Sequence, residues 1–153
     1  MKSLEAQLER ERSAAACLLE ILREEYQALA RRDIAALDLA VSKKQQQFTE
    51  LEALGSDRDA GFRACGLAAG REGIETCLHR QPHGAAHRLW EELQSLLIRC
   101  QYQNQINGGM VEISRHHVQR TLSLLQGQPP EQQTYGPSGA AGTAIRSSLY
   151  TAI

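Results

Sequence analysis

The chain has 153 residues, carries 17 Lys or Arg against 18 Asp or Glu, and contains few aromatic residues. This length suits one domain, or one domain with a tail. The abundance of Leu, Ala, Glu, Gln and Arg favours long helices over a thick globular core. The balanced charge, with no basic run interleaved with aromatic residues, argues against nucleic-acid binding. No segment has the apolar core of a signal peptide or the length of a membrane span, so we expect a cytoplasmic protein without stable membrane insertion.

Apolar residues recur at intervals of three and four between residues 4 and 29. This period predicts an amphipathic first helix. Ser3 can cap its N-terminus, and Arg31 lies where a cation favours a helix C-terminus. Glu11 and Glu25 interrupt the apolar stripe.

Asp33 is placed to act as the N-cap of a second helix. Its apolar residues repeat every 3.5 residues or so, which is typical of a helix packed lengthwise on another helix. They are Ile34, Leu37, Val41, Phe48 and Leu51, with Lys44 at a seam position. The sequence "GSD" at 55–57 predicts an end or a kink in this helix. Residues 56–83 contain four Gly and predict a connector of two short helical pieces.

A periodic segment from Gly84 to Gln126 predicts a last helix of more than about 35 residues, roughly 55 Å long at 1.5 Å per residue. Its apolar stripe comprises Leu89, Trp90, Leu93, Leu96, Leu97, Cys100, Val111, Val118, Leu122 and Leu125. Asn104 and Asn107 fall on the same stripe, and Gly108 and Gly109 follow them.

These polar and glycine residues need a physical reason. An Asn on an apolar seam costs stability if it is buried unpaired, but it can fix register or pair with the backbone of a bound segment. Two Gly inside a helix are unfavourable, yet they let another backbone approach closely. With the adaptable Met110, the segment predicts a groove that receives another helix. The alternative is a kink at the Gly pair.

Residues 127–153 are rich in Pro, Gly, Ser and Thr and have no helical period, which predicts a flexible tail after a helical domain of residues 1–126. The tail still carries five larger apolar residues, either as a docking motif or incidentally. They are Tyr135, Ile145, Leu149, Tyr150 and Ile153.

Catalytic motifs are absent from the sequence, so we do not expect an enzyme. One cluster resembles a metal site and consists of Cys77, His79, His83 and His87. It has no second ligand pair elsewhere in the chain, and a His-containing loop at a helix N-terminus is the simpler interpretation. We therefore expect neither a metal nor a cofactor.

The stretch "CQYQNQINGGMVE" at 100–112, followed by a Pro-rich break and "TYGPSG", resembles the FlgN family of flagellar type III export chaperones. The resemblance implies a small, cytoplasmic, all-helical protein. In that family an Asn-x-x-Asn stretch lies in the last long helix and a Tyr-Gly element lies in a mobile C-terminal tail.

The resemblance also implies partners. Such chaperones bind the C-terminal helices of the hook–filament junction proteins FlgK and FlgL, prevent their premature assembly and deliver them to the export gate protein FlhA. The implied client-binding residues are Asn104, Asn107, Gly108, Met110, Val111, Val118 and Leu122. Tyr135 and Gly136 match the element that docks at the gate.

The predicted fold is all-α: an elongated antiparallel helical bundle, or coiled-coil-like hairpin, of two to three long helices with a short-helix connector and a flexible C-terminal tail. Two other functions stay open. One is a structural coiled-coil protein that self-associates through its helical stripes, as a homodimer for example. The other is a metal-dependent or regulatory protein that uses the Cys77–His87 cluster.

Overall fold

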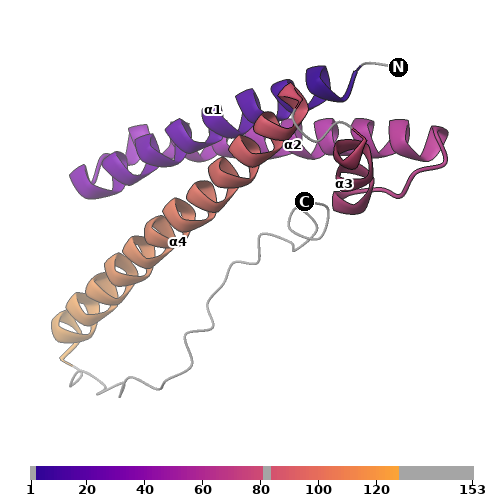
Figure 1. The fold of residues 1–153 in the computed structure, drawn as a ribbon. Helices are drawn as coiled ribbons and strands as arrows, with labels where there is room; N and C mark the ends of the chain where they lie inside the picture. Colours follow the sequence, from indigo (N-terminus) through magenta and orange to yellow (C-terminus); the bar gives the residue numbers. More distant parts are fainter. Residues whose placement is uncertain (1–2, 81–83, 128–153) are drawn as a thin grey trace.

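A computed structural model describes residues 3–80 and 84–127 and shows helices and no strand over these residues (Figure 1). The helices are α1 (Leu4–Arg31), α2 (Ile34–Ala64), α3 (Arg71–His79) and α4 (Ala85–Leu125). The all-α fold with long helices predicted from the sequence is confirmed. None of the described helices is apolar enough over a sufficient length to cross a membrane.

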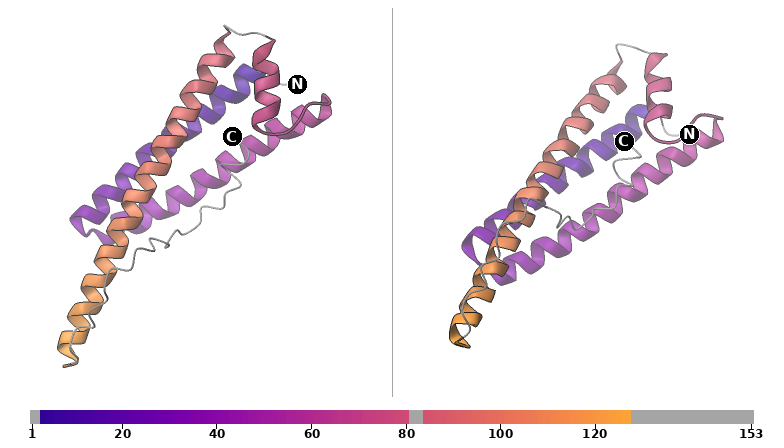
Figure 2. Two further views of the ribbon diagram at one scale, coloured as in Figure 1. Left: turned by 60° about the horizontal axis from the view of Figure 1, so that its bottom comes forward. Right: turned by 90° about the horizontal axis from the view of Figure 1, so that it is seen from below.

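Helix α1 lies at the centre, because both α2 and α4 make their extensive contacts with it (Figure 2). It buries ten of its 28 residues, whereas α4 buries six of 41. Consecutive long helices run in opposite directions. Helix α4 therefore runs parallel to α1, and the Sγ of Cys100 contacts the carbonyl of Ala15 in the same alignment that places Asn107 beside Leu22.

The predicted caps at the start of α1 and at the start of α2 are confirmed. The hydroxyl of Ser3 accepts a hydrogen bond from the backbone N–H of Ala6, and the carboxylate of Asp33 accepts one from Ala36. Between the helices, Arg32 adopts a left-handed conformation with φ of 57°. Its N–H caps the last carbonyls of α1, which satisfies groups that a helix end leaves without partners.

The helix end predicted at "GSD" is wrong, because α2 continues through residues 55–57 to Ala64. The short helical piece expected around Phe62 is the last turn of α2, and only the piece around Ile74 forms a separate helix, α3. Tertiary packing explains the difference. The buried side chains of Leu54, Arg58 and Phe62 hold this part of α2 against the core, which outweighs the cost of about 1 kcal/mol for a helical Gly.

The predicted inner face of α2 is also partly wrong. Ile34 and Val41 are exposed, and Leu37 and Phe48 are only half-buried. In the first half of α2 the buried positions directly precede the predicted ones: Ala40 is buried instead of Val41, and Gln47 instead of Phe48. The buried residues of α2 are Ala40, Gln47, Leu51, Leu54, Arg58 and Phe62. Helix α1 determines which face of α2 is buried, because its two buried carboxylates need cations of α2 opposite them.

These carboxylates are the residues that interrupt the α1 stripe. Glu11 pairs with Arg58 at 2.5 Å, and both side chains are buried. Arg58 also contacts Asp59, whose carboxylate accepts a hydrogen bond from the N–H of Gly70 at 3.0 Å. Burial raises the pKa of Glu11 despite the Arg58 charge, because desolvation disfavours the carboxylate. The second carboxylate, Glu25, pairs with Lys44 at 2.5 Å.

Gly73 allows α3 to pack against the end of α2. A Cβ at this position would lie 2.1 Å from the carbonyl oxygen of Ala68 and 2.7 Å from the ring of Phe62. We expect Gly73→Ala to lower the free energy of unfolding by about 1–3 kcal/mol, because the backbone must move to relieve the overlap. Urea denaturation measures the change. Gly108→Ala is the matched control: its Cβ meets nothing within 4 Å, so it should stabilise the helix by about 0.5–1 kcal/mol. Equal effects at the two positions would contradict the packing role of Gly73.

Candidate functional site

The contact between α1 and α4 ends in a polar cluster around Asn107, which is only 2% exposed. Its amide nitrogen donates hydrogen bonds to the carbonyl of Leu22 and to Glu25, both at 2.8 Å. Gln103 donates to its amide oxygen at 3.0 Å. Since Glu25 also pairs with Lys44, one buried carboxylate joins all three long helices. The Asn107 amide, predicted to meet a client, is therefore engaged by its own chain.

Beyond Asn107 the apolar line of α4 continues without cover. No residue of α4 after Asn107 is buried, and the C-terminal part of the helix projects past the α1–α2 turn (Figures 1 and 2). We call this line the terminal stripe; it consists of Val111, Val118, Leu122 and Leu125, with exposed fractions of 48% to 79%. Its spacing of seven, four and three residues keeps it on the face that packs on α1 further back.

The glycine pair lies where α4 leaves the bundle. The helix is continuous through both positions. Gly108 and Gly109 are exposed, and a Cβ on either would meet nothing within 4 Å. Asn104 and Met110 are half-buried, and Asn104 makes no side-chain hydrogen bond to another described residue. The backbone here is thus accessible to a second molecule.

Charged groups flank the terminal stripe without covering it. Arg115 donates to the carboxylate of Glu112 at 2.7 Å and holds the pKa of that carboxyl below its usual range. His116 lies 3.2 Å from the same carboxylate. Exposed pairs of this kind contribute little stability. Their main effect is to keep the surface beside the terminal stripe polar along the arm, as we call the part of α4 after Asn107.

The structure brings no metal site together in its described part. No group of three or more His, Cys, Asp or Glu there could hold a metal ion, and His83 lies outside the described residues. Burial raises the pKa of the Cys100 thiol to about 11, so this thiol is protonated at neutral pH. Tyr135 and Gly136 also lie outside the described residues.

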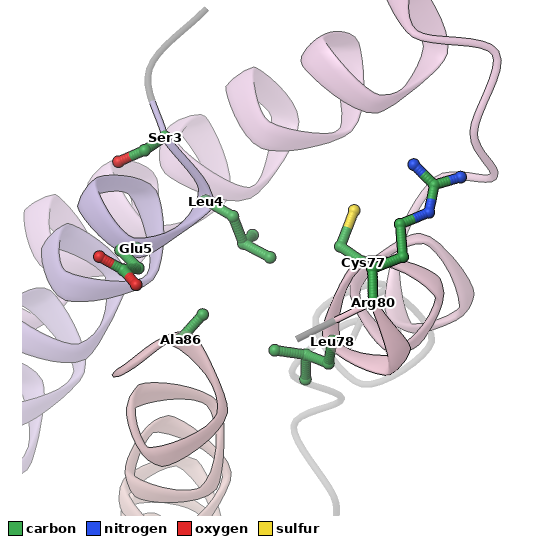
Figure 3. Close-up of a pocket in the computed structure, with 7 residues that line it drawn as sticks. All are labelled: Ser3, Leu4, Glu5, Cys77, Leu78, Arg80 and Ala86. Atoms are coloured by element: carbon green, nitrogen blue, oxygen red, sulfur yellow. The ribbon is translucent and has the colours of Figure 1, made fainter. Parts of the chain in front are cut away.

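One pocket lies where the starts of α1 and α4 meet the end of α3 (Figure 3). It is lined by Ser3, Leu4, Glu5, Cys77, Leu78, Arg80 and Ala86. The Ser3 hydroxyl already caps α1, and the apolar side chains of Leu4 and Leu78 face the space between the helices. This pocket offers no pairing of nucleophile and base, so the terminal stripe is the better candidate site.

The fold and the terminal stripe define an all-α protein whose last helix extends past its neighbours and presents an uncovered apolar face. The FlgN protein family model matches residues 1–143. The chain therefore belongs to the FlgN family, a family of flagellar export chaperones, and the resemblance found in the sequence is confirmed.

A solved structure supports the same assignment. It is described as a flagella synthesis protein, FlgN, from Pseudomonas aeruginosa, and it matches with a TM-score of 0.62 and 31% sequence identity. The match covers 72% of this chain and 90% of that chain. A comparison with curated proteins found no match.

The buried cluster around Asn107 predicts that the two Asn residues contribute differently to stability. We expect Asn107→Ala to lower the free energy of unfolding by about 1–3 kcal/mol, because it removes hydrogen bonds to a buried carboxylate and a carbonyl. Asn104→Ala should change it by less than about 0.5 kcal/mol. Chemical denaturation of both variants measures the difference. Equal destabilisation would show that Asn107 does not hold α4 on α1.

Proposed function

We propose that this chain binds the C-terminal amphipathic helices of FlgK and FlgL in the cytoplasm, prevents their premature assembly and delivers them to FlhA. The observation that carries the proposal is the continuity of one apolar line. The face of α4 that packs on α1 as far as Asn107 runs on uncovered through Val111, Val118 and Leu122. An amphipathic helix laid along it would continue the packing that α1 begins.

The residues around the exit point take different roles in this proposal. Val111, Val118 and Leu122 supply the apolar contact area. Gly108 leaves room for an approaching backbone, and the half-buried Met110 can adapt to the side chains that arrive. In this helix-in-groove contact, Gly108 and Met110 lie at the end nearest the bundle, and the three apolar residues run along its length.

The two Asn residues are not equivalent. The Asn104 side chain has no partner among the described residues and can hydrogen-bond to a client. Asn107 is committed to Glu25 and Leu22, so we assign it a positioning role: it fixes the direction in which the arm leaves the bundle.

Burial of apolar area drives this binding at about 25 cal/mol per Å², reduced by the cost of ordering the client. The chain presents no nucleotide-binding motif. Release at the gate would then follow from competition for the client or for the residues after α4, among which Tyr135 matches the gate-docking element of the family.

Leu122 and Leu124 provide a matched test of the client surface. Both are exposed leucines of α4, but they lie two residues apart and point to different sides of the helix. We expect Leu122→Glu to weaken the binding of FlgK and FlgL C-terminal fragments by roughly 10- to 100-fold, the loss of one buried leucine contact. Leu124→Glu should leave the affinity within about twofold. Titration calorimetry measures both.

Failure of this test would take one of two forms. If neither fragment binds the wild-type chain, the client assignment is wrong. If the fragments bind and both variants bind equally well, the client lies on another surface. Clear self-association through the terminal stripe without client binding would favour the structural coiled-coil alternative.

Tyr135 allows gate docking to be separated from client binding. We expect Tyr135→Ala to weaken binding of the FlhA cytoplasmic domain at least about tenfold, because truncating a hot-spot aromatic residue costs 2 kcal/mol or more. FlgK and FlgL affinities should not change. Pull-down or calorimetry with a pre-formed chaperone–client complex measures the effect, and Tyr150→Ala is a control in the same segment. Unchanged FlhA binding by Tyr135→Ala would refute the docking role.

A further inference from the structure

Helix α4 carries a second apolar line on the side opposite the terminal stripe. We call it the back stripe; it consists of Ile98, Tyr102, Ile106, Gly109 and Ile113. Steps of four, four, three and four residues keep these positions on one face of a helix. Each residue turns the helix by about 100°, so this face lies roughly half a turn away from Asn107 and Val111.

The back stripe is open to solvent at each of its positions except Ile106, which is half-buried. Ile98, Tyr102 and Ile113 are 64% to 72% exposed, and a Cβ on Gly109 would meet nothing within 4 Å. The buried residues of α4 lie on the opposite face of the helix, and the proposed client surface lies there too. A row of large apolar side chains in water indicates a partner.

The stripe is complementary to itself when the helix direction is reversed. About a midpoint between positions 105 and 106, Ile98 and Ile113 are equally distant, and so are Tyr102 and Gly109. Two copies of α4 packed antiparallel about this point would set isoleucine on isoleucine. They would also set the bulky Tyr102 ring over the position where the other copy has no side chain.

The charges at the two ends obey the same symmetry. Glu91 and Arg120 are also equally distant from the midpoint, lie in line with the back stripe, and are exposed. Among the described residues Glu91 forms one ion pair, with the half-buried His87 at 3.4 Å. In the antiparallel arrangement each Glu91 faces Arg120 of the other copy, at both ends of the contact. Parallel packing would instead place like charges side by side.

We propose that the back stripe is the interface of a two-fold symmetric dimer in which two α4 helices pack antiparallel. An interface between identical surfaces must be complementary to itself, and the isoleucine, tyrosine–glycine and acid–base pairs all meet that condition about a single point. The dimer leaves the terminal stripe free, so it goes beyond client binding and does not depend on it.

A pair of substitutions two residues apart tests the surface. Ile113 and Val111 are both exposed β-branched residues of α4 on opposite faces. We expect Ile113→Glu to raise the dimer dissociation constant of the full chain at least about tenfold, which corresponds to the loss of roughly 1.4 kcal/mol. Val111→Glu should change it less than about twofold. Sedimentation velocity over a concentration series measures the constant.

The outcomes separate this dimer from client binding. A wild-type chain that stays monomeric at about 100 μM would overturn the proposal and leave the back stripe to a different protein or to residues 128–153. Disruption by Val111→Glu instead of Ile113→Glu would overturn it too, by placing self-association on the terminal stripe. Calorimetry with FlgK and FlgL fragments should show the opposite pattern, with Val111→Glu defective and Ile113→Glu intact.

Charge reversal tests the antiparallel register. Glu91→Arg and Arg120→Glu should each weaken the dimer about two- to fivefold, because each replaces an attraction by a repulsion at an exposed site. The double variant restores opposite charges at both ends and should return the constant to within about twofold of wild type. Single effects that simply add in the double variant would overturn the antiparallel register.

The glycine position offers an independent check. Gly109→Leu should fill the space over which Tyr102 of the other copy packs, and so weaken the dimer at least about tenfold. Gly108→Leu is the control: it makes the same substitution at a helical glycine on a different side of α4 and should weaken the dimer less. Equal effects of the two substitutions would contradict the tyrosine–glycine contact.

Discussion

One buried carboxylate sets the geometry of this protein. Glu25 lies on the central helix, and both of its oxygens are used: one meets Lys44 of α2 and the other meets Asn107 of α4. An unpaired carboxylate at this depth would be strongly unfavourable, so neither neighbouring helix can slide along α1 without breaking a bond to it. Glu11 also links α1 to α2, through one oxygen that meets Arg58 near the other end of α2. Apolar packing holds the helices together, and these polar contacts fix their register.

The position of this cluster explains where the exposed surface begins. It lies close to the end of α1, and α4 continues for 41 residues in all while α1 has only 28. The same apolar repeat of α4 therefore has two environments. Before Asn107 it contributes to the core; after Asn107 no residue of α4 is buried, and the repeat lies in water. The polar cluster around Asn107 lies at this border, where the buried part of α4 ends. Its hydrogen bonds hold the arm at a fixed angle, and a binding surface needs such rigid support.

Local chemistry made much of the fold predictable. Ser3, Asp33 and the apolar period located α1, the start of α2 and the length of α4, since caps and periodicity depend on near neighbours. The inner face of α2 and its length could not be read in this way, because Arg58 and Phe62 are held by residues far away in sequence. One signal was present: Glu11 and Glu25 are separated by the same interval as Lys44 and Arg58, as expected for two antiparallel helices joined by two ion pairs. The partner of Asn107 was not predictable, because nothing near it in sequence distinguishes a bond to α1 from a bond to a client.

The two proposed contacts use opposite faces of α4. In an antiparallel pair joined through the back stripes, the terminal stripes of the two copies point away from each other, on opposite sides of the contact. A client helix bound to one copy would not touch the client bound to the other, so each chain would still bind one client while the assembly contained two of each. Such separation would keep the apolar faces of the two proposed client helices from meeting each other. The glycine pair would serve both contacts at the point where the helix leaves the bundle, because a Cβ at either position meets nothing within 4 Å. In these proposals Gly108 exposes the backbone to the client, and Gly109 exposes it to the second copy.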